Sequence, residues 1–336
     1  YVLVTAQHRQ LLDQVLRIFN ITPDYDLDVM TANQSPSSVF AQVLERIRPV
    51  LADLRPDWVL VQGDTTTVLA ATLAAAYFRV PVGHVEAGLR TYDRTNPFPE
   101  EINRVLTDHA ASLHFAPTEN ARSSLLSEGI SEANVYVTGN TVVDALQVIT
   151  ARQLTPPSKD ILNGLPRKKR LILVTAHRRE NFGAPLQRII TALLELAHRE
   201  DAHIVYPVHP NPSVNEPVKK ALGGHHNISL LPPLDYLTFA HLMKSAYVIL
   251  TDSGGIQEEA PGLGVPVLVM RAVTERPEAI DAGTAALVGS ETEKIVSVTT
   301  HLLNDKSAYQ EMAQAVNPFG DGNAARKIVR ILLRQN

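Results

Sequence analysis

Residues 247–269 read YVILTDSGGIQEEAPGLGVPVLV and predict a strand, a glycine turn, a short helix and a second strand. The apolar runs 247–250 and 265–270 are typical of strands buried in a parallel sheet. The helix formers between them, at 256–260, follow Gly254 and Gly255, which leave the first backbone N–H groups of the helix accessible. Such a helix start binds anions, most often phosphate, because unpaired N–H groups face the ligand. The alternative is an ordinary strand-to-helix turn with Asp252 or Ser253 as the N-cap.

The side chains around this turn suit a nucleotide. Ser253 adds a hydroxyl, and the absence of side chains on Gly254 and Gly255 lets an anion approach the backbone. Glu258 and Glu259 follow within about one helical turn, where a carboxylate is able to bind ribose hydroxyls. The stretch alone leaves both interpretations open, a phosphate site and a plain helix cap.

The same alternation of strand and helix runs on both sides of this stretch and predicts an α/β fold. Short links between apolar strands and helices favour parallel sheets with right-handed crossovers. We expect two Rossmann-like parallel-sheet domains, at 1–141 and 142–317, and a C-terminal helix in 318–336 that packs back on the first domain. The proline-rich stretch 153–170 resembles a joint, although the helix beginning at Val142 is an alternative connector.

Composition narrows the class of protein. The 336 residues are enough for two domains, and a net charge of −4 gives no basic field for nucleic acid. No apolar run reaches the roughly 20 residues that a membrane span needs. The chain has no cysteine, which excludes disulfides and thiolate nucleophiles and suits a reducing compartment. We therefore expect a cytoplasmic protein that binds neither nucleic acid nor membrane.

Two carboxylates follow successive strands of the first half. Asp64 comes after the strand 58–61, and Glu86 comes after the strand 81–85. Ligands of parallel sheets bind at the carboxyl ends of the strands, so these residues are either helix caps or members of a site. Glu100 begins a later helix, where a carboxylate also stabilises the helix dipole without any catalytic role.

The two halves differ in the chemistry that they offer. The sequence has no GxxxxGK[ST] or HExxH motif, and its 12 histidines show no metal-ligand spacing. Acids predominate at the strand ends of the first half, whereas His177, Arg271, Arg276 and the glycine turn lie in the second. If the carboxyl edges of both sheets face one cleft, the site suits a phosphate-bearing leaving group at one end and proton transfer at the other. Clustered carboxylates raise each other's pKa, so one is able to donate a proton while another accepts one.

Nine motifs then carry a specific resemblance. They read GDTTT (63–67), GHVEAGLRT (83–91), PFPEE (97–101), TGNTVVDAL (138–146), TAHRREN (175–181), VYPVHPNP (205–212), TDSGGIQEEAPGLGVPVL (251–268), TERPEA (274–279) and NPFGDGNA (317–324). In this order they resemble the non-hydrolysing UDP-N-acetylglucosamine 2-epimerases from Tyr1 to the C-terminal helix. The resemblance implies a fold like that of GT-B glycosyltransferases, usually as a homodimer. It also implies interconversion of UDP-GlcNAc and UDP-ManNAc at C2 without NAD and without a required metal.

The resemblance assigns roles to individual residues. It implies anti elimination of UDP to 2-acetamidoglucal, followed by re-addition of UDP on the other face. The matches to the family's site are the catalytic Asp64, Glu86, Glu100 and His177, and the substrate-binding Arg178, Phe239, Ser253, Gly254, Gly255, Glu259 and Arg276. Which carboxylate acts as acid and which as base stays open at this point.

Two further features come from the same resemblance. Some bacterial members bind a second UDP-GlcNAc as an activator, and Gln7, His8, Gln10, Arg178 and His209 fall on those positions. Family members also open with a strand and a GTRPE-type loop and helix, which are not found before Tyr1. We therefore expect a missing first strand and helix, and little or no activity of the chain as given.

Two other functions fit the same sequence. A GT-B glycosyltransferase would share the fold and the UDP site, although the three carboxylates favour proton chemistry. A catalytically inactive module that binds a UDP-sugar would fit a chain that lacks the first strand of the family.

Overall fold

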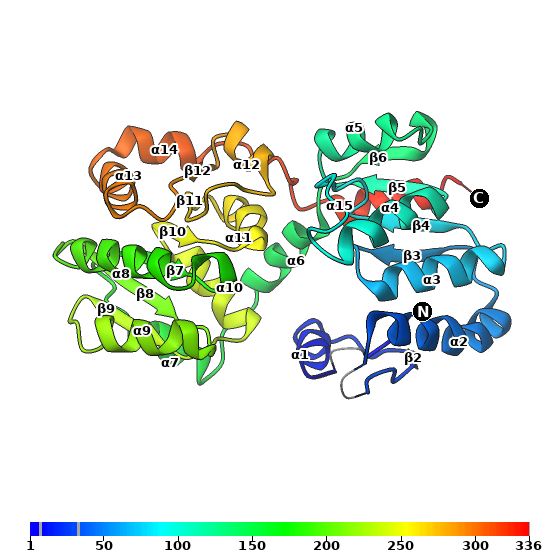
Figure 1. The fold of residues 1–336 in the computed structure, drawn as a ribbon, viewed down its shortest axis with the longest axis horizontal. Helices are drawn as coiled ribbons and strands as arrows, with labels where there is room; N and C mark the ends of the chain where they lie inside the picture. Colours follow the sequence, from blue (N-terminus) through cyan, green and yellow to red (C-terminus); the bar gives the residue numbers. More distant parts are fainter. Residues whose placement is uncertain (7–8, 32–33, 336) are drawn as a thin grey trace. The chain divides into compact units, whose positions relative to one another are not determined.

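The chain divides into two compact units in the computed structural model, which describes residues 1–6, 9–31 and 34–335 (Figure 1). The first unit comprises Tyr1–Asp144 and Gly322–Asn336, and the second comprises Ala145–Asp321. The chain passes from one unit to the other inside helix α6 (Thr141–Thr150), ahead of the proline-rich stretch. The sequence-based boundaries, after residues 141 and 317, lie a few residues before those of the structure.

The second unit is built on a parallel sheet. Within residues 145–321, all of which the structure describes, six strands pair in the order β12-β11-β10-β7-β8-β9. Their bounds are β7 (Arg170–Thr175), β8 (Ala202–Pro207), β9 (Ile228–Leu231), β10 (Val248–Thr251), β11 (Val267–Val269) and β12 (Ala285–Leu287). The chain runs outward from β7 to β9 and then returns to place β10 on the other side of β7. A ligand crevice is expected at this reversal, outside the carboxyl ends of β7 and β10.

Helices cover this sheet and close its core. They are α7 (Ser158–Asn163), η2 (Arg179–Asn181), α8 (Ala184–Leu196), α9 (Pro212–Leu222), α10 (Tyr236–Ser245), α11 (Gly254–Glu259), η3 (Ala260–Leu263), α12 (Pro277–Asp281), α13 (Thr292–Asn304) and α14 (Lys306–Ala313). In α8, Leu186, Ile189, Leu193 and Leu196 recur every three or four residues and are all buried. This spacing puts them on one helix face, in the same core as strand residues such as Ile172.

The first unit contains two sheets of parallel strands among its described residues. Strands β1 (Leu3–Val4) and β2 (Tyr25–Asp26) form one pair. The other sheet has the order β3-β4-β5-β6, with bounds β3 (Val59–Gln62), β4 (Val82–Val85), β5 (Leu113–Ala116) and β6 (Val135–Val137). Because Gln62 pairs with Val85, the residues that follow β3 and β4 emerge at the same edge of this sheet.

Helices of the first unit hold these strand ends in place. They are α1 (Arg9–Phe19), α2 (Pro36–Leu54), α3 (Thr66–Tyr77), α4 (Glu100–Ala110), α5 (Glu119–Ser127), η1 (Glu132–Asn134), α6 and α15 (Ala324–Leu332). Helix α3 contacts both α2 and α4, and its buried Ala70 and Ala74 permit the close approach. The Thr65 hydroxyl accepts from the backbone N–H of Val68, which caps α3 directly after Asp64.

The C-terminal helix α15 belongs to the first unit. Ile328 is buried against Val85, Leu113 and Phe115 of β4 and β5. The carboxylate of Asp144 accepts hydrogen bonds from the first two backbone N–H groups of α15, at 3.1 and 2.9 Å. The chain therefore returns to the first unit after Asp321. Helix α15 is held there by the hydrogen bonds to Asp144 and by the packing of Ile328.

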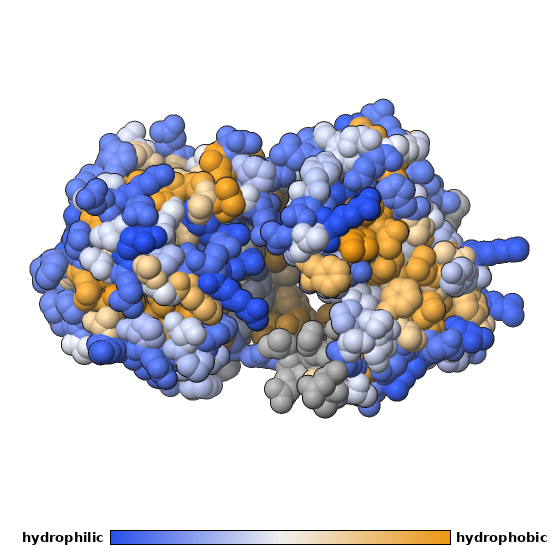
Figure 2. All heavy atoms as spheres, viewed as in Figure 1, coloured by the Kyte–Doolittle hydropathy of each residue, from blue (hydrophilic) through white to orange (hydrophobic). Residues whose placement is uncertain are grey.

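None of the helices in the described part of the chain is both long and apolar enough to cross a bilayer. In the view of Figure 2, hydrophilic and hydrophobic side chains are interspersed over the visible faces of each unit.

Candidate active site

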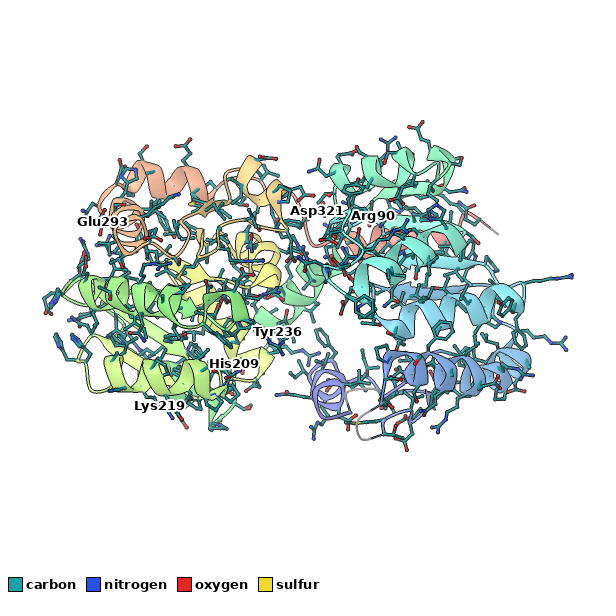
Figure 3. The ribbon with its side chains drawn as sticks, in the orientation of Figure 1. Arg90, His209, Lys219, Tyr236, Glu293 and Asp321 are labelled. Carbon is teal, nitrogen blue, oxygen red and sulfur yellow. The ribbon has the colours of Figure 1, made fainter. Side chains whose placement is uncertain are left out.

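A pocket of about 410 Å³ opens in the second unit where the sheet order reverses. Its walls come from the segments that follow β7, β8 and β10, together with α10 and α11. The lining residues are Thr175, Ala176, His177, Pro207, Val208, His209, Pro210, Pro233, Tyr236, Phe239, Ser253, Gly255, Ile256 and Glu259. Figure 3 labels His209 and Tyr236 of this wall. Five residues predicted from sequence for a site, namely His177, Phe239, Ser253, Gly255 and Glu259, therefore meet at one pocket, with His209 beside them.

The loop after β7 is fastened to the end of β10 by Asp252. One carboxylate oxygen, Oδ2, accepts hydrogen bonds from the backbone N–H groups of His177 and Arg178, each at 2.9 Å. The same oxygen accepts from the side-chain amide of Asn181 at 3.0 Å. The alternative of Asp252 as the helix N-cap is wrong, because Ser253 occupies that position and the Asp252 carboxylate binds the neighbouring loop.

The glycine turn begins helix α11 with its N-cap hydroxyl unused. Ser253 occupies the N-cap position, yet its side chain accepts no capping hydrogen bond. A Cβ on Gly254 would lie 3.8 Å from Nη2 of Arg178, so this guanidinium reaches the turn. The Nε of Arg178 is buried and has no hydrogen-bond partner among the described residues. Neither Arg178 nor Gly254 lines the pocket. The cationic side chain of Arg178 nevertheless lies next to the glycine turn of that pocket.

The opposite wall carries an acid with a raised pKa. The hydroxyl of Tyr236 donates a hydrogen bond of 3.0 Å to Oε1 of Glu259. Burial raises the pKa of Glu259 to about 7, and the nearby charge of Glu258 adds to this effect, while the Tyr236 hydrogen bond opposes it. Phe239 and Pro233 supply apolar surface nearby. The wall therefore combines a hydrogen-bond acceptor with a flat apolar face.

The pKa of His177 is shifted in the opposite direction to that of Glu259. Burial lowers the pKa of His177, Asp252 acts in the opposite direction, and His209 and Arg178 add to the lowering. The His177 and His209 rings are stacked, with centroids 5.6 Å apart. His177 is therefore held mainly as a neutral imidazole at neutral pH.

Two predicted arginines are engaged elsewhere. Arg276 donates through Nε to the buried carboxylate of Glu258, and it does not line the pocket. Arg271 donates to Glu180 at 2.5 Å and also forms an ion pair with Glu275. The structure thus gives both side chains intramolecular acidic partners, and a substrate contact for Arg276 stays a prediction.

The first unit brings its predicted carboxylates to one sheet edge. Asp64 and Glu86 follow the paired ends of β3 and β4, and a Cβ on Gly63 would lie 3.9 Å from Oε2 of Glu86. Asp64 is ion-paired with Arg104 of α4, and its backbone carbonyl accepts from Asn103 at 2.9 Å. Helix α4 therefore fixes the turn that carries Asp64.

Glu100 lies at the start of the same helix and lines a pocket of about 400 Å³. The other lining residues are Met30, Thr31, Gln34, Pro36, Val39, Thr65, Thr66, Pro99 and Asn103. Thr65 and Asn103 line this pocket together with Glu100. Since Thr65 follows Asp64 in the chain and Asn103 donates to the Asp64 carbonyl, Asp64 lies next to the pocket. Asp64 and Glu86 themselves do not line this pocket.

A buried ionic network supports this region and was not predicted from sequence. Nδ1 of His84 lies 2.5 Å from Oδ1 of Asp108, and Nε2 lies 2.8 Å from the carbonyl oxygen of Gly63. Arg90 pairs with Asp108 at 2.8 Å and with Glu128 at 2.7 Å. Only the GHVEAGLR motif hinted at these residues, because His84 and Arg90 flank Glu86 in it.

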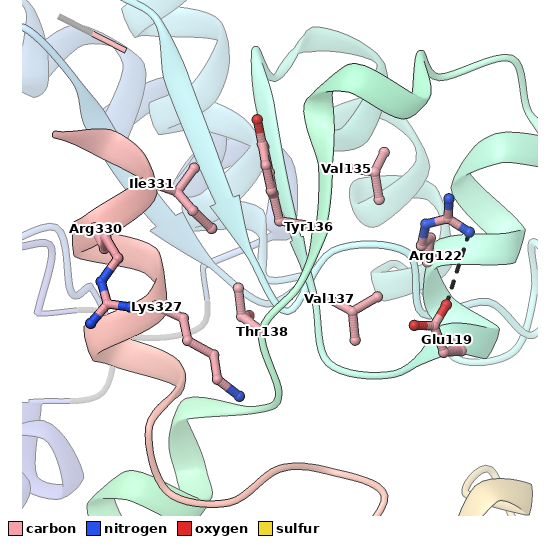
Figure 4. A pocket seen from close by; sticks show the side chains of 9 residues that line it. All are labelled: Glu119, Arg122, Val135, Tyr136, Val137, Thr138, Lys327, Arg330 and Ile331. Atoms are coloured by element: carbon pink, nitrogen blue, oxygen red, sulfur yellow. Dashed lines mark ion pairs between the residues drawn. The ribbon is translucent and has the colours of Figure 1, made fainter. Parts of the chain in front are cut away.

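A third hollow, of about 380 Å³, lies between β6 and α15 (Figure 4). Arg122 on its rim pairs with Glu119 at 3.9 Å and also with Glu132. Lys327 and Arg330 project from α15 on the other side. None of the residues predicted for the site lines this hollow.

Gln7 and His8 lie outside the described residues, and Gln10 lies in α1 with its side chain outside the description. Within the described ranges, no group of three or more acidic, histidine or cysteine side chains is arranged to hold a metal ion.

The two Rossmann-like units and their strand-end sites define a two-domain α/β protein of the GT-B-like class. A family model for UDP-N-acetylglucosamine 2-epimerase matches residues 1–333. The chain belongs to the UDP-N-acetylglucosamine 2-epimerase family.

Individual relatives support this membership. The chain is 54% identical over 339 residues to a UDP-N-acetylglucosamine 2-epimerase of Yersinia pestis, covering 98% of this chain and 90% of the relative. It resembles the crystal structure of UDP-GlcNAc 2-epimerase from Neisseria meningitidis bound to UDP-GlcNAc, with a TM-score of 0.87 and 48% identity over 99% of this chain and 91% of the other. For the UDP-GlcNAc 2-epimerase of Methanocaldococcus jannaschii the TM-score is 0.84 at 38% identity, covering 96% and 89%.

Proposed function

We propose that this protein interconverts UDP-GlcNAc and UDP-ManNAc by inverting C2. The observation that carries the proposal is the similarity along nearly the whole chain to UDP-N-acetylglucosamine 2-epimerases, at 54% identity for the Yersinia pestis enzyme. The Neisseria meningitidis structure, which has UDP-GlcNAc bound, supports a UDP-sugar as the substrate.

The reaction proceeds by elimination and re-addition. A base removes the proton from C2, the C1–O bond breaks, and its electron pair leaves with UDP. The former C2–H pair forms the C1=C2 double bond of 2-acetamidoglucal. In the return step the diphosphate oxygen attacks C1, and an acid delivers a proton to C2 from the opposite face. No oxidant or reductant is consumed, because every electron pair stays within the sugar and UDP.

The carboxylates of the first unit supply the proton chemistry in this proposal. Asp64, Glu86 and Glu100 are the candidates for base and acid, since two opposite faces of C2 need two separate groups. Arg104 and Asn103 hold the Asp64 turn against α4, which reduces its freedom to move out of reach of the sugar. Such fixed geometry is what a proton transfer over hydrogen-bond distance requires.

The pocket of the second unit holds the leaving group in this proposal. The diphosphate contacts Ser253, Gly254 and Gly255, with His177 and Arg178 beside it, because buried N–H donors and cations stabilise the charge that develops on departing UDP. Support comes from the orphaned Nε of Arg178 and the unused N-cap hydroxyl of Ser253. Glu259 accepts from the ribose hydroxyls, and Phe239 packs against the base.

Three finer points belong to the same proposal. We expect a homodimer, which light scattering coupled to size-exclusion chromatography measures directly. We expect a second UDP-GlcNAc to act as an activator near His209 and Arg178, which a sigmoidal dependence of rate on UDP-GlcNAc would reveal. The cytoplasmic location is supported by a composition without cysteine.

Incubation with UDP-GlcNAc in deuterated water tests the reaction. Epimerisation predicts deuterium at C2 in both sugars and the appearance of UDP-ManNAc. UDP release only on addition of a glycosyl acceptor would instead identify a glycosyltransferase. Binding of UDP-GlcNAc without any exchange would identify an inactive binding module and would overturn the proposal.

A further inference from the structure

Asp252 is fully buried at the end of β10, directly before the glycine turn. Its Oδ2 receives three N–H donors, all from the loop after β7. These three hydrogen bonds compensate much of the cost of removing a carboxylate from water. Oδ2 alone is therefore sufficient to anchor the loop.

The second oxygen of Asp252 has a different environment. Oδ1 lies 3.3 Å from Nδ1 of His177, but it has no hydrogen-bond partner among the described residues. A buried acceptor without a donor is costly, and at this distance a small rotation of the imidazole is enough to align an Nδ1–H with Oδ1. The proton of the neutral His177 ring is therefore favoured on Nδ1.

We infer that Asp252 is a positioning residue that fixes the orientation and the tautomer of His177 toward the nucleotide. This inference rests on the proposed function, in which His177 lies beside the leaving diphosphate. With Nδ1 held by Asp252, Nε2 on the far side of the ring is the nitrogen available to the ligand. When Nε2 takes up a proton from solvent and donates a hydrogen bond to the departing diphosphate, the carboxylate stabilises the imidazolium.

Hydrogen bonds other than those to Asp252 also hold the loop after β7. The positioning of His177 by Asp252 can therefore be tested apart from the anchoring of the loop. The buried hydroxyl of Tyr206 donates to the carbonyl of Ala176 at 3.1 Å, one residue before His177. Asn181 also donates to the carbonyl of Met270 at 3.1 Å. Since these bonds do not involve the Asp252 oxygen that faces His177, the loop keeps contacts when that oxygen is altered.

Asp252→Asn tests the inference. The amide keeps one oxygen for the three N–H donors, but it presents an NH₂ group to Nδ1 of His177. This change favours the Nε2–H tautomer and leaves the imidazolium without its counter-charge. We expect kcat to fall about 10- to 100-fold, the range known for loss of the partners that orient metal-ligating histidines. We expect KM and the Kd for UDP to change less than about threefold, since the diphosphate contacts themselves remain.

A spectroscopic measurement tests the tautomer without any turnover. The ¹⁵N chemical shifts of His177, assigned by comparison with His177→Gln, report which ring nitrogen carries the proton. The parent protein should show Nδ1–H, and Asp252→Asn should shift the ring toward Nε2–H. If Asp252→Asn does not fold, the parent spectrum alone decides, and Nε2–H in the parent would overturn the inference.

Asn181→Ala is the matched control, because it removes one hydrogen bond to Asp252 and leaves the carboxylate facing His177. We expect its kcat to stay within about threefold of the parent and its His177 tautomer to be unchanged. An equal loss of kcat in both variants would overturn the inference and make Asp252 a loop anchor only. A parent that shows Nδ1–H but no exchange at C2 would contradict the proposed function while leaving the positioning of His177 intact.

Discussion

The hydroxyl of Tyr236 donates a hydrogen bond of 3.0 Å to Oε1 of Glu259 in the wall of the pocket of the second unit. Burial raises the pKa of Glu259 to about 7, and the Tyr236 hydrogen bond keeps it from rising further. Glu259 therefore changes its charge within the physiological pH range. Burial sets the pH at which that change occurs, and the Tyr236 hydrogen bond lowers it.

Affinity for UDP-GlcNAc should rise with pH because of this pair. Ionised Glu259 accepts hydrogen bonds from ribose hydroxyls better than the protonated acid, and its ionised fraction grows about tenfold between pH 6 and pH 8. Calorimetric titration with UDP-GlcNAc, whose diphosphate does not titrate in this range, measures the effect. Tyr236→Phe should move the midpoint to higher pH, since the stabilising hydrogen bond is lost. Glu259→Gln should bind with no such pH dependence, and an unchanged dependence in that variant would refute the assignment.

The same carboxyl should make stability depend on pH. The pKa of Glu259 is 4.5 in its usual setting and about 7 in the folded protein. The folded state thus binds a proton that the unfolded state lacks between these values. The resulting stabilisation is complete below about pH 4.5 and is lost as pH rises through about 7. From pH 5 to pH 8 the parent should lose up to about 3 kcal/mol of unfolding free energy relative to Glu259→Gln. Urea unfolding of both proteins at each pH measures this difference, and parallel curves would contradict it.

Local patterns in the sequence predict β7, β8, β10 and β11 of the second unit, but not β9. The apolar runs at 171–175, 202–208 and 247–250 correspond to β7, β8 and β10. A strand buried on both faces reads as a continuous apolar run, so it can be identified from its own sequence without knowledge of the neighbouring strands. The convergence of strand ends on a pocket also follows from parallel pairing. His177, Ser253 and Glu259 could therefore be grouped before any coordinates were known.

Contacts of individual polar side chains do not follow from such patterns. Asp252 satisfies the rule for a helix cap locally, yet its carboxylate binds backbone N–H groups 74 and 75 residues earlier. That contact exists only once β10 pairs with β7, so no local pattern contains it. Arg276 looks like a free cation in TERPEA, but the buried Glu258 lies within reach after folding.

Because the His84–Asp108 pair is buried, we expect that replacing the Asp108 carboxylate with a neutral group lowers the unfolding free energy strongly. Although burial opposes it, hydrogen bonds and charges of His84 and Arg90 lower the pKa of Asp108. Asp108→Asn removes the carboxylate that faces both His84 and Arg90, so His84 loses its acidic partner and Arg90 keeps only Glu128 among its acidic partners in the described part of the chain. We expect a loss of about 3–5 kcal/mol in unfolding free energy. The exposed pair Arg48–Glu45 is the matched control: Glu45→Gln should cost less than about 1 kcal/mol. Equal losses in the two variants would show that burial of the network adds nothing.

Alanine substitutions at Gly88 and Gly129 distinguish the stability cost of a steric clash from that of backbone strain. Both have positive φ, +86° and +87°. A Cβ on Gly88 would lie 2.2 Å from the carbonyl oxygen of Ala121, whereas a Cβ on Gly129 would meet nothing within 4 Å. Gly129→Ala should cost about 1–2 kcal/mol, the price of a left-handed backbone. Gly88→Ala should cost clearly more, because the backbone of α5 must also move. Thermal unfolding of the two variants measures the difference, and a smaller loss for Gly88→Ala would contradict the packing of α5 on the loop after β4.

Asp64→Asn should separate proton transfer from nucleotide binding. Asp64 belongs to the first unit, whereas every residue of the pocket with Ser253 and Glu259 belongs to the second. Loss of the carboxylate should lower the rate of deuterium exchange at C2 at least about 100-fold, as expected for a general acid or base. The Kd for UDP should stay within about twofold. Asp93→Asn, at an exposed carboxyl in the loop between Glu86 and Glu100, is the control and should exchange at the parent rate. Full exchange by Asp64→Asn would remove Asp64 from the mechanism and leave Glu86 and Glu100 as the two groups that face C2.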